Sequence, residues 1–387
     1  MSTNKFHPKR LEQIEALRGI AFLGVFLSHT GIVCFGAAGH WGVSIFLVLS
    51  GFMMMYSYYD KNRITQSGFF YCIQFSAHKI RKLYPLHILT MLSMAAFWFV
   101  GGGGECIQID ALKFILNVFL IQEWFPIKNV SINGVSWYLV TAAFCYFIFP
   151  KVLRVLENIK DIKKVFCALL ILLILQVILD KMISHLPKLL PNDLFLSDIS
   201  EWLIYFFPLT RSLDFIMGVF TGYLFLNNYS RKQFNNILVN KLLHVCLNKW
   251  ILLSIIILAN VICVYFECYV LNLKGEATGR YIWWTYSVPF TFSSCALIYY
   301  MVREPMNFES LMVNKVTLFL GRISSAAFLI HYVVFQYIKS FLCYYIGRGF
   351  YNEYGSLIKL IIGFIITIMV TLIWERIESG CFTSQGK

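Results

Sequence analysis

Charged residues are scarce in this sequence. They make up 14% of its 387 residues, whereas a soluble globular domain carries about 25%. Apolar residues reach 58%, so there is too little polar surface to coat a globule in water, and a single large soluble core is excluded. The mean hydropathy of +0.67 indicates instead that most of the chain lies in a lipid bilayer.

Paired cysteines and a cleavage signal are also missing. The 11 cysteines are scattered and include no Cys-x-x-Cys pair, so the sequence predicts neither a metal site nor a redox motif. The first apolar run follows a short basic leader but has no small-residue cleavage site. We therefore expect this run to stay in the protein as a membrane anchor.

Apolar runs long enough to cross a bilayer recur along the whole chain. A transmembrane helix needs about 20 apolar residues. The candidate spans are residues 14–34, 41–59, 80–100, 136–155, 164–185, 209–226, 250–270, 283–302, 318–339 and 355–376. The shorter stretch 112–124 is expected to be interfacial or re-entrant. The sequence thus predicts an all-α, polytopic transmembrane helical bundle of about ten spans, forming one domain over residues 1–387 with no appended soluble domain.

The net charge of +13 is distributed as expected for a membrane protein. With the N-terminus inside, most of the 33 Lys and Arg residues fall in segments on the cytoplasmic side, as the positive-inside rule requires. The basic residues then set the orientation and meet anionic membrane lipids. We predict that both termini are cytoplasmic and that the protein has no nucleic-acid partner.

Two ionisable residues lie in the first apolar run, where each costs about 2.5–3.5 kcal/mol at mid-helix on insertion scales. Arg18 and His29 are eleven residues apart, which places them on one helix face, about 16 Å apart along the axis. Glu15 is positioned to pair with Arg18, and an interfacial arginine that snorkels would explain Arg18 equally well. Because imidazole takes and returns protons near neutral pH, we predict a functional role for His29.

A basic cluster precedes the third apolar run. Lys79, Arg81 and Lys82 lie close together at its predicted cytoplasmic end, followed by Pro85. A positive-inside anchor is one explanation. The other is a binding site for phosphate groups, in which lysine supplies a point charge and arginine a planar fork.

Three other runs carry polar residues. Ser50 and Gly51 lie in the middle of the second run, where small residues permit close helix contact. Arg211 and Asp214 open the sixth run three residues apart and predict an ion pair within one helix. His331 lies inside the ninth run, which makes it a second-rank candidate for a functional site.

These patches, in this order, resemble the acyltransferase-3 family of membrane O-acyltransferases. The matching segments are Leu17–Ala21 with His29, Gly42–Phe52, Lys79–Pro85, Arg211–Gly218 and Ser324–His331. Many family members carry a Trp-Ser-Leu-x-x-Glu motif, whereas the segment starting at Trp137 has Ala142 at the glutamate position. This departure resembles the branch that acts on exopolysaccharides and related envelope glycans.

The resemblance implies about ten helices in the bacterial inner membrane and an acyl-CoA donor on the cytoplasmic side. It implies transfer of a short acyl group, usually acetyl, to a hydroxyl of a glycan or lipid-linked sugar. Acetyl-CoA or succinyl-CoA is then a co-substrate, and no cofactor is bound permanently. Arg18, Lys79 and Lys82 are expected to bind the CoA phosphates, and His29 to act as general base or acyl carrier. Second-rank candidates are Glu15, Ser50, Trp137, Arg211, Asp214 and His331.

A transporter or exporter of polysaccharide intermediates is the alternative, because many spans and intramembrane charges fit it too. The Arg18–His29 pair and the basic residues Lys79 and Lys82 discriminate between the two functions. An exporter of sugars needs an aromatic lining and has no need of a phosphate-binding site. A purely structural scaffold would leave the histidines in the apolar runs unexplained.

Overall fold

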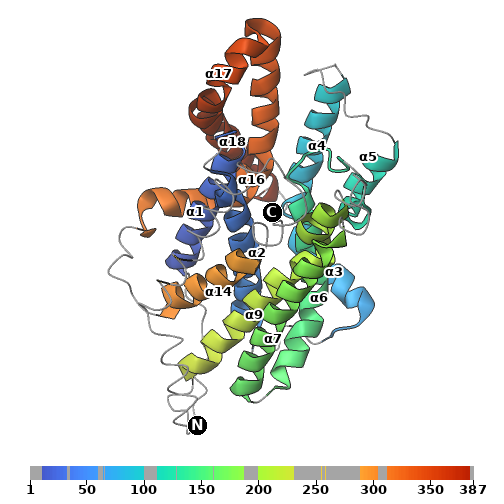
Figure 1. Ribbon diagram of the computed structural model, residues 1–387, viewed down its shortest axis with the longest axis vertical. Coiled ribbons are helices and arrows are strands. Elements are labelled where there is room, and N and C mark those ends of the chain that lie inside the picture. Colours follow the sequence, from blue (N-terminus) through green and yellow to red (C-terminus); the bar gives the residue numbers. More distant parts are fainter. Residues whose placement is uncertain are drawn as a thin grey trace.

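The protein is all-helical wherever its structure is described. The computed structural model describes residues 11–32, 35–59, 64, 66–99, 111–127, 129–159, 161–186, 199–230, 254, 258, 288–303 and 312–383. Within these ranges there is no strand (Figure 1). The predicted all-α class is therefore confirmed for this part of the chain.

Twelve α-helices and four shorter turns follow one another along these ranges. The α-helices are α1 (Glu12–Ser28), α2 (Gly36–Tyr58), α3 (Phe69–Ile80), α4 (Tyr84–Phe99), α5 (Ala111–Val118), α6 (Trp137–Glu157), α7 (Ile162–Ile183), α9 (Pro208–Ser230), α14 (Val288–Arg303), α16 (Lys315–Phe341), α17 (Arg348–Ile358) and α18 (Phe364–Thr383). The shorter turns are a 3-10 turn, η2 (Gln122–Trp124), and the single π-helical turns η4 (Trp202–Phe206), η6 (Leu342–Ile346) and η7 (Lys359–Gly363).

Six helical segments are long and apolar enough to cross a membrane, which supports the predicted multi-pass character. They are Ala38–Tyr58, Trp137–Glu157, Lys163–Ile183, Ile199–Asn227, Lys315–Ile346 and Arg348–Gly380. Helices α1, α4 and α14 match three further predicted spans but are shorter than 18 residues. The predicted span 250–270 lies outside the described ranges apart from two single positions, so the count of ten stays a prediction.

The first predicted span is wrong at its C-terminal end, because α1 stops at Ser28 and not near residue 34. The Ser28 hydroxyl donates to the Val25 carbonyl at 2.8 Å, and the Thr30 hydroxyl donates to the Leu27 carbonyl at 2.7 Å. These side chains satisfy carbonyls that a helix end leaves without partners. Gly31 then adopts a φ of +91°, which the missing side chain permits. His29 therefore lies at the end of its helix and not within it.

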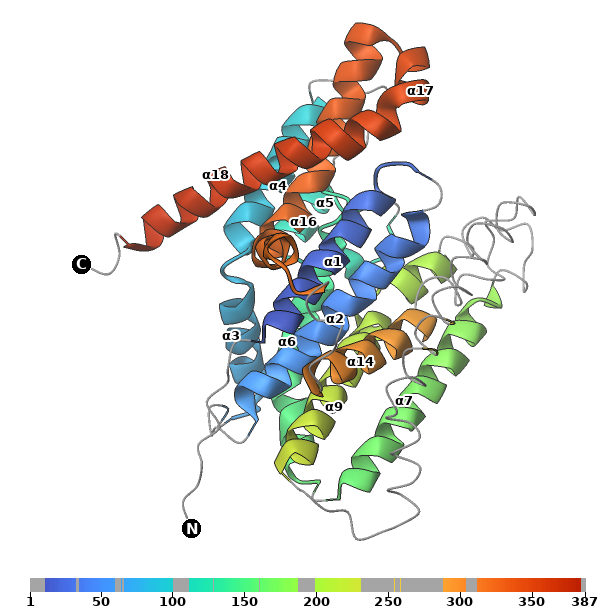
Figure 2. The same cartoon turned by 90° about the vertical axis from the view of Figure 1, so that its left-hand side faces the viewer.

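Glycines bring the central helices into close contact. Gly19 of α1 and Gly321 of α16 face the backbone of the opposite helix so closely that a Cβ at either position would collide with it. Gly51 of α2 and Gly218 of α9 make the same contact with each other's helices. Helix α1 thus packs between α16 and α2, and α2 packs on α9 (Figure 2). The role predicted for Gly51 in close helix packing is confirmed.

The outer helices carry most of the exposed apolar surface. Only 11% of the apolar segment of Lys163–Ile183 is buried inside the protein. The buried share is 17% for Arg348–Gly380 and 72% for Ala38–Tyr58. In Figure 2, α18 crosses α16 and its C-terminal end projects away from the bundle. In a bilayer such surface faces lipid and requires no protein partner.

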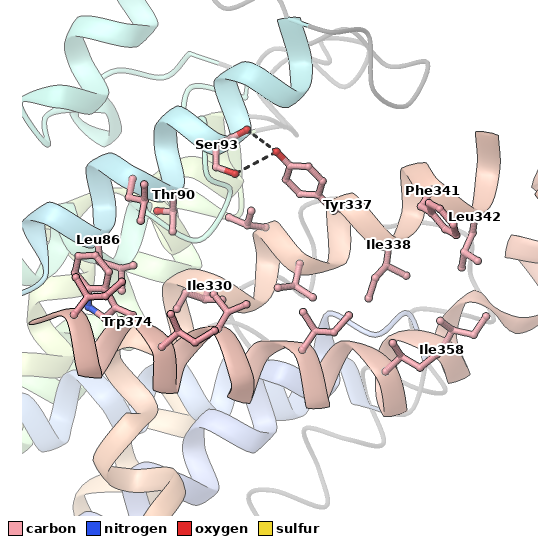
Figure 3. A pocket seen from close by; sticks show the side chains of 18 of the residues that line it. Leu86, Thr90, Ser93, Ile330, Tyr337, Ile338, Phe341, Leu342, Ile358 and Trp374 are labelled. Carbon is pink, nitrogen blue, oxygen red and sulfur yellow. Dashed lines mark hydrogen bonds between the residues drawn. The ribbon is translucent and has the colours of Figure 1, made fainter. Parts of the chain in front are cut away.

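An apolar groove of about 890 Å³ runs between α4 and the α16–α18 unit (Figure 3). Tyr337 of α16 donates to the Ser93 carbonyl of α4 at 3.1 Å and closes one side of it. No acidic or basic side chain is found among the described residues that line the groove. It therefore holds no groups for acid–base chemistry, and the candidate site lies elsewhere.

Candidate active site

His29 at the end of α1 is the centre of the candidate site. Its Nδ1 lies 2.8 Å from the carbonyl oxygen of Val25. Only a protonated ring nitrogen bonds to a carbonyl oxygen, so Nδ1 carries the proton and Nε2 keeps its lone pair. Within the described part of the chain, no hydrogen bond engages Nε2. The helix end thus selects the tautomer whose basic nitrogen is available.

His331 of α16 packs against His29, although the two residues are 302 positions apart. Its Nδ1 lies 3.3 Å from the Ala327 carbonyl, so its Nε2 is the unprotonated nitrogen. This Nε2 lies 3.4 Å from His29 Nδ1, in position to accept a second hydrogen bond from the same His29 N–H. The His331 side chain is fully buried. The rings around it are those of Phe22, Phe26, Phe328 and Phe335.

A first cavity, of about 270 Å³, lies on the Arg18 side of this histidine pair; we call it the Arg18 cavity. Arg18 lines it and donates from Nη2 to the Ser325 hydroxyl at 2.9 Å. Ser50 also lines it, 3.0 Å from the hydroxyl of Tyr146. Lys79 contributes an ammonium group, 4.6 Å from the centre of the Tyr58 ring.

The Arg18 cavity ends at aromatic rings that adjoin the histidines. Tyr138 and Phe328 both line it, with ring centres 5.2 Å apart. The Phe328 ring is also 5.8 Å from the ring of His331. A layer of one or two aromatic rings therefore separates the cavity that holds Arg18 and Lys79 from the imidazole pair.

A second cavity, of about 660 Å³, adjoins His29 through another ring; we call it the Trp137 cavity. Tyr332 lines this cavity, and its ring meets that of His29 edge-on at 5.9 Å. Trp137 lines it as well, from the start of α6. His29 and His331 are thus bordered by the Arg18 cavity through Phe328 and by the Trp137 cavity through Tyr332.

The Trp137 cavity contains a buried carboxylic acid, Glu123 of η2. Its side chain is 4% exposed, and the Ser131 hydroxyl donates to Oε1 at 2.6 Å. Burial raises the pKa of Glu123 to about 7, although the bond from Ser131 acts in the opposite direction. Near neutral pH this carboxyl group is therefore present both protonated and ionised.

Comparisons with known proteins identify the family. The acyltransferase-3 family model, described as an acyltransferase domain, matches residues 11–375. The chain belongs to this family. It is also similar to the acyltransferase MdmB of Streptomyces mycarofaciens, with 26% identity over 231 residues that cover 54% of this chain and 56% of the relative. The match thus spans about half the length of that relative. No solved structure matches the chain.

In this acyltransferase-3 protein, Arg211 and Asp214 form the predicted ion pair at 3.1 Å, with both side chains almost fully buried. Asp214 also accepts hydrogen bonds from Gln176 of α7, Thr291 of α14 and Ser44 of α2. A buried charge pair needs such additional bonds to offset its desolvation. Neither residue lines the Arg18 cavity or the Trp137 cavity. The pair joins four helices and lies outside the candidate site.

Two other predicted residues also lie apart from the site. Lys82 is exposed and reaches Glu378 of α18 at 4.0 Å, so it does not line the cavity that contains Lys79. The backbone of Glu15 lies against Gly321 at the contact of α1 with α16. The hydrogen-bond partner that the structure gives Arg18 is Ser325 of α16, a residue that the analysis of the first apolar run did not include.

Sequence analysis missed the residues of the Trp137 cavity other than Trp137 itself. Glu123 stands at the end of the apolar stretch 112–124, and a carboxyl there was a signal that could have been followed. Trp98 and Trp202 carry no such signal, because aromatic residues are common throughout this chain and are typical of membrane interfaces.

Proposed function

We propose that this protein is a membrane O-acyltransferase. It moves a short acyl group, acetyl or succinyl, from a cytoplasmic acyl-CoA to a sugar hydroxyl of an envelope or exported glycan. The observation that carries this proposal is the environment of His29. Its Nε2 is unprotonated, and its neighbours His331 and Tyr332 adjoin, through Phe328 and directly, a cavity with two cationic groups and a second, aromatic cavity. Membership of the acyltransferase-3 family supports it.

The Arg18 cavity is suited to the donor. A guanidinium and an ammonium group are the side chains that bind phosphate best, the first as a fork and the second as a point charge. At about 270 Å³ the cavity is at the small end of ligand sites, so the nucleotide part of CoA would remain at its mouth. The pantetheine arm would then have to pass the rings of Tyr138 and Phe328 to reach His29, about 16 Å from Arg18 along α1.

His29 supplies the proton transfer. In one route, Nε2 takes the proton from the acceptor hydroxyl while its oxygen attacks the thioester carbonyl. A C–O bond forms, the C–S bond breaks, and the CoA thiolate receives the proton from the imidazole. In the other route, Nε2 attacks the thioester carbonyl, an N–C bond forms and the C–S bond breaks with release of the thiolate. The acceptor oxygen then attacks the acyl-imidazole, the C–O bond forms as the N–C bond breaks, and the hydroxyl proton passes to the thiolate. Both routes start from the tautomer that the Val25 carbonyl selects.

The protein is assigned to the bacterial inner membrane with both termini in the cytoplasm. This orientation follows the distribution of basic residues along the chain. It directs Arg18 toward the cytoplasmic side, where acyl-CoA is available, and His29 toward the outer end of α1. The acyl group would therefore move about 16 Å along one helix, about half of the hydrocarbon thickness of a bilayer.

Thiol release from acetyl-CoA by the purified protein in nanodiscs tests the proposal. We expect release that depends on a glycan acceptor and falls about 100-fold or more in His29→Ala. His185→Ala is the matched control, because His185 also bonds to the carbonyl four residues earlier but is exposed and lines neither cavity. It should act at the wild-type rate.

Two outcomes would contradict the proposal in different ways. Wild-type activity in His29→Ala would remove His29 from the centre of the mechanism. Absence of both binding and turnover of acetyl-CoA and succinyl-CoA would exclude the enzyme and favour an exporter of polysaccharide intermediates.

A further inference from the structure

The Trp137 cavity has walls made largely of flat aromatic rings. Trp98, Trp137, Trp202, Phe206 and Tyr332 line it, together with short polar segments. Its volume of about 660 Å³ is in the range of small-molecule sites, about 300–1,000 Å³. Aromatic rings offer broad apolar faces with a polar group at one edge. A sugar ring matches this pattern, because its C–H faces are apolar and its hydroxyls point outward.

Two hydrogen-bond donors of the wall lack partners. The indole N–H groups of Trp98 and Trp202 are buried, and neither has a hydrogen-bond partner in the described structure. A buried donor without a partner is unfavourable, and a native protein normally supplies one. Both nitrogens are enclosed by protein atoms and do not face the cavity, so these residues offer a bound molecule their aromatic rings alone.

Glu123 supplies the complementary acceptor. Its Oε1 accepts from Ser131, whereas Oε2 has no hydrogen bond in the described structure and is not enclosed by protein atoms. A carboxyl oxygen at the wall of an aromatic cavity can accept from a ligand hydroxyl and, when protonated, donate to one. The lining therefore offers aromatic rings and a carboxyl group to the same bound molecule.

The cavity also adjoins the reacting imidazole. Tyr332 is shared between the cavity wall and the His29 contact. Gly134 lies beneath it, and a Cβ at this position would collide with the Tyr332 ring. The ring is thereby held between the cavity and His29. The apolar groove beside α18 has no carboxyl group among its described lining residues.

We propose that the Trp137 cavity binds the sugar ring of the acyl acceptor, with the rings of Trp98 and Trp202 packing against it and with Glu123 bonding to its hydroxyls. This inference rests on the proposed acyltransferase function. It assigns acceptor specificity to η2, η4 and the end of α4, away from the donor cavity. Trp202 and Glu123 are the residues that determine this specificity.

Binding and kinetics in nanodiscs test the assignment. The probes are lactose, cellobiose and the methyl glycosides of glucose, galactose and rhamnose, titrated without acyl-CoA and followed by tryptophan fluorescence and calorimetry. We expect at least one probe to bind. Trp202→Ala and Glu123→Gln should each weaken its binding, and raise the acceptor KM, by roughly tenfold. The acetyl-CoA KM should stay unchanged, and Trp202→Phe should retain part of the binding because it keeps the stacking face.

Trp374→Ala is the matched control, because Trp374 lines the apolar groove and not the Trp137 cavity. It should leave sugar binding unchanged. Unchanged acetyl-CoA binding in Trp202→Ala shows that this variant is folded. Failure of every sugar to bind, or equal binding by wild type and both variants, would overturn the proposal.

The outcomes separate this inference from the proposed function. Sugar binding that depends on Trp202, without any acyl transfer, would retain the site and reject the enzyme. Acyl transfer that depends on His29 and is insensitive to Trp202 and Glu123 would retain the enzyme and reject the sugar site.

Discussion

The C-terminal ends of α1 and α7 have the same local structure. In α1, Ser28 precedes His29, whose Nδ1 lies 2.8 Å from the carbonyl four residues earlier. In α7, Ser184 precedes His185, whose Nδ1 lies 2.7 Å from the equivalent carbonyl. The serine oxygen is 3.4 Å from Nδ1 in both cases. Both helix ends therefore select the same histidine tautomer.

What surrounds the two ends differs completely. His29 packs against His331 and Tyr332 and adjoins two cavities. His185 is exposed at the end of a helix that is mostly unburied. The comparison shows that the hydrogen bonds at a helix end fix the tautomer of a histidine, whereas the packing of distant helices determines which groups surround it.

The largest difference expected between the two regions is in the pH dependence of the free energy of unfolding. Glu123, near the α1 end, has its pKa raised by burial from the ordinary 4.5 to about 7. The folded state thus binds this proton more tightly than the unfolded chain does. The resulting contribution of Glu123 to the free energy of unfolding is complete below pH 4.5 and is lost as the pH rises to about 7. The loss is on the order of 3 kcal/mol. Thermal unfolding across this window should show the decline, and Glu123→Gln should abolish it.

Asp161 is the control for this pH effect. It is exposed at the start of α7, where its carboxylate accepts from the Lys163 backbone N–H. Asp161→Asn should keep the wild-type decline in stability between pH 4.5 and 7. The same decline in Glu123→Gln would show that another group causes it.

A methyl group at Gly321 should force α1 away from α16. The added Cβ would collide with the Glu15 backbone, and overpacking of this kind costs about 1–3 kcal/mol. Gly321→Ala should lower the melting temperature and reduce acyl transfer, because it disturbs the helix that carries His29. Gly349→Ala in α17, where the space is open, should leave both unchanged. Wild-type behaviour of Gly321→Ala would mean that the helix contact adjusts freely.

Removing His331 should make the α1 end resemble the α7 end, with a histidine that lacks its neighbour. We expect kcat to fall by about 10- to 100-fold from loss of orientation, with the acetyl-CoA KM unchanged. His331→Asn should recover part of the rate because it keeps a hydrogen-bonding group. If the variant without His331 instead raised the acetyl-CoA KM by the same factor as it lowered kcat, and lost the folded state, the role of His331 would be structural alone.

The smallest effect should come from the shared serine. The hydroxyls of Ser28 and Ser184 each donate to a helix carbonyl at 2.8 Å, and such a bond contributes about 1 kcal/mol. Ser28→Ala and Ser184→Ala should therefore lower stability by the same small amount in denaturant unfolding. A much larger loss for Ser28→Ala would show that the two ends already differ locally.

Much of the fold could be predicted from local pattern. Apolar runs of sufficient length marked most of the helices that the structure describes, but not α3 (Phe69–Ile80) or most of α17 (Arg348–Ile358). The order of short polar segments indicated the family. The end of α1 could not be found in this way. Hydropathy averages over a window and does not register that Ser28 and Thr30 bond back to the helix carbonyls.

The candidate site was predicted only in part. Arg18, Lys79 and Ser50 line the Arg18 cavity, whereas His29 lies outside it and contacts His331. Lys82 does not line it, although it is three positions from Lys79, because the chain turns between α3 and α4 and separates the two side chains. Nearness in sequence was therefore a poor guide at this helix end.

The sequence by itself determined the membrane character, the helical class and the chemical identity of the key side chains, because these depend on composition and on contacts within one turn of helix. The tertiary structure alone decided that His29 meets His331, that Arg211 and Asp214 bind helices together, and that an aromatic cavity forms around Glu123. These arrangements depend on how closely distant helices approach. That distance is set by glycines and side-chain packing at contacts hundreds of residues apart.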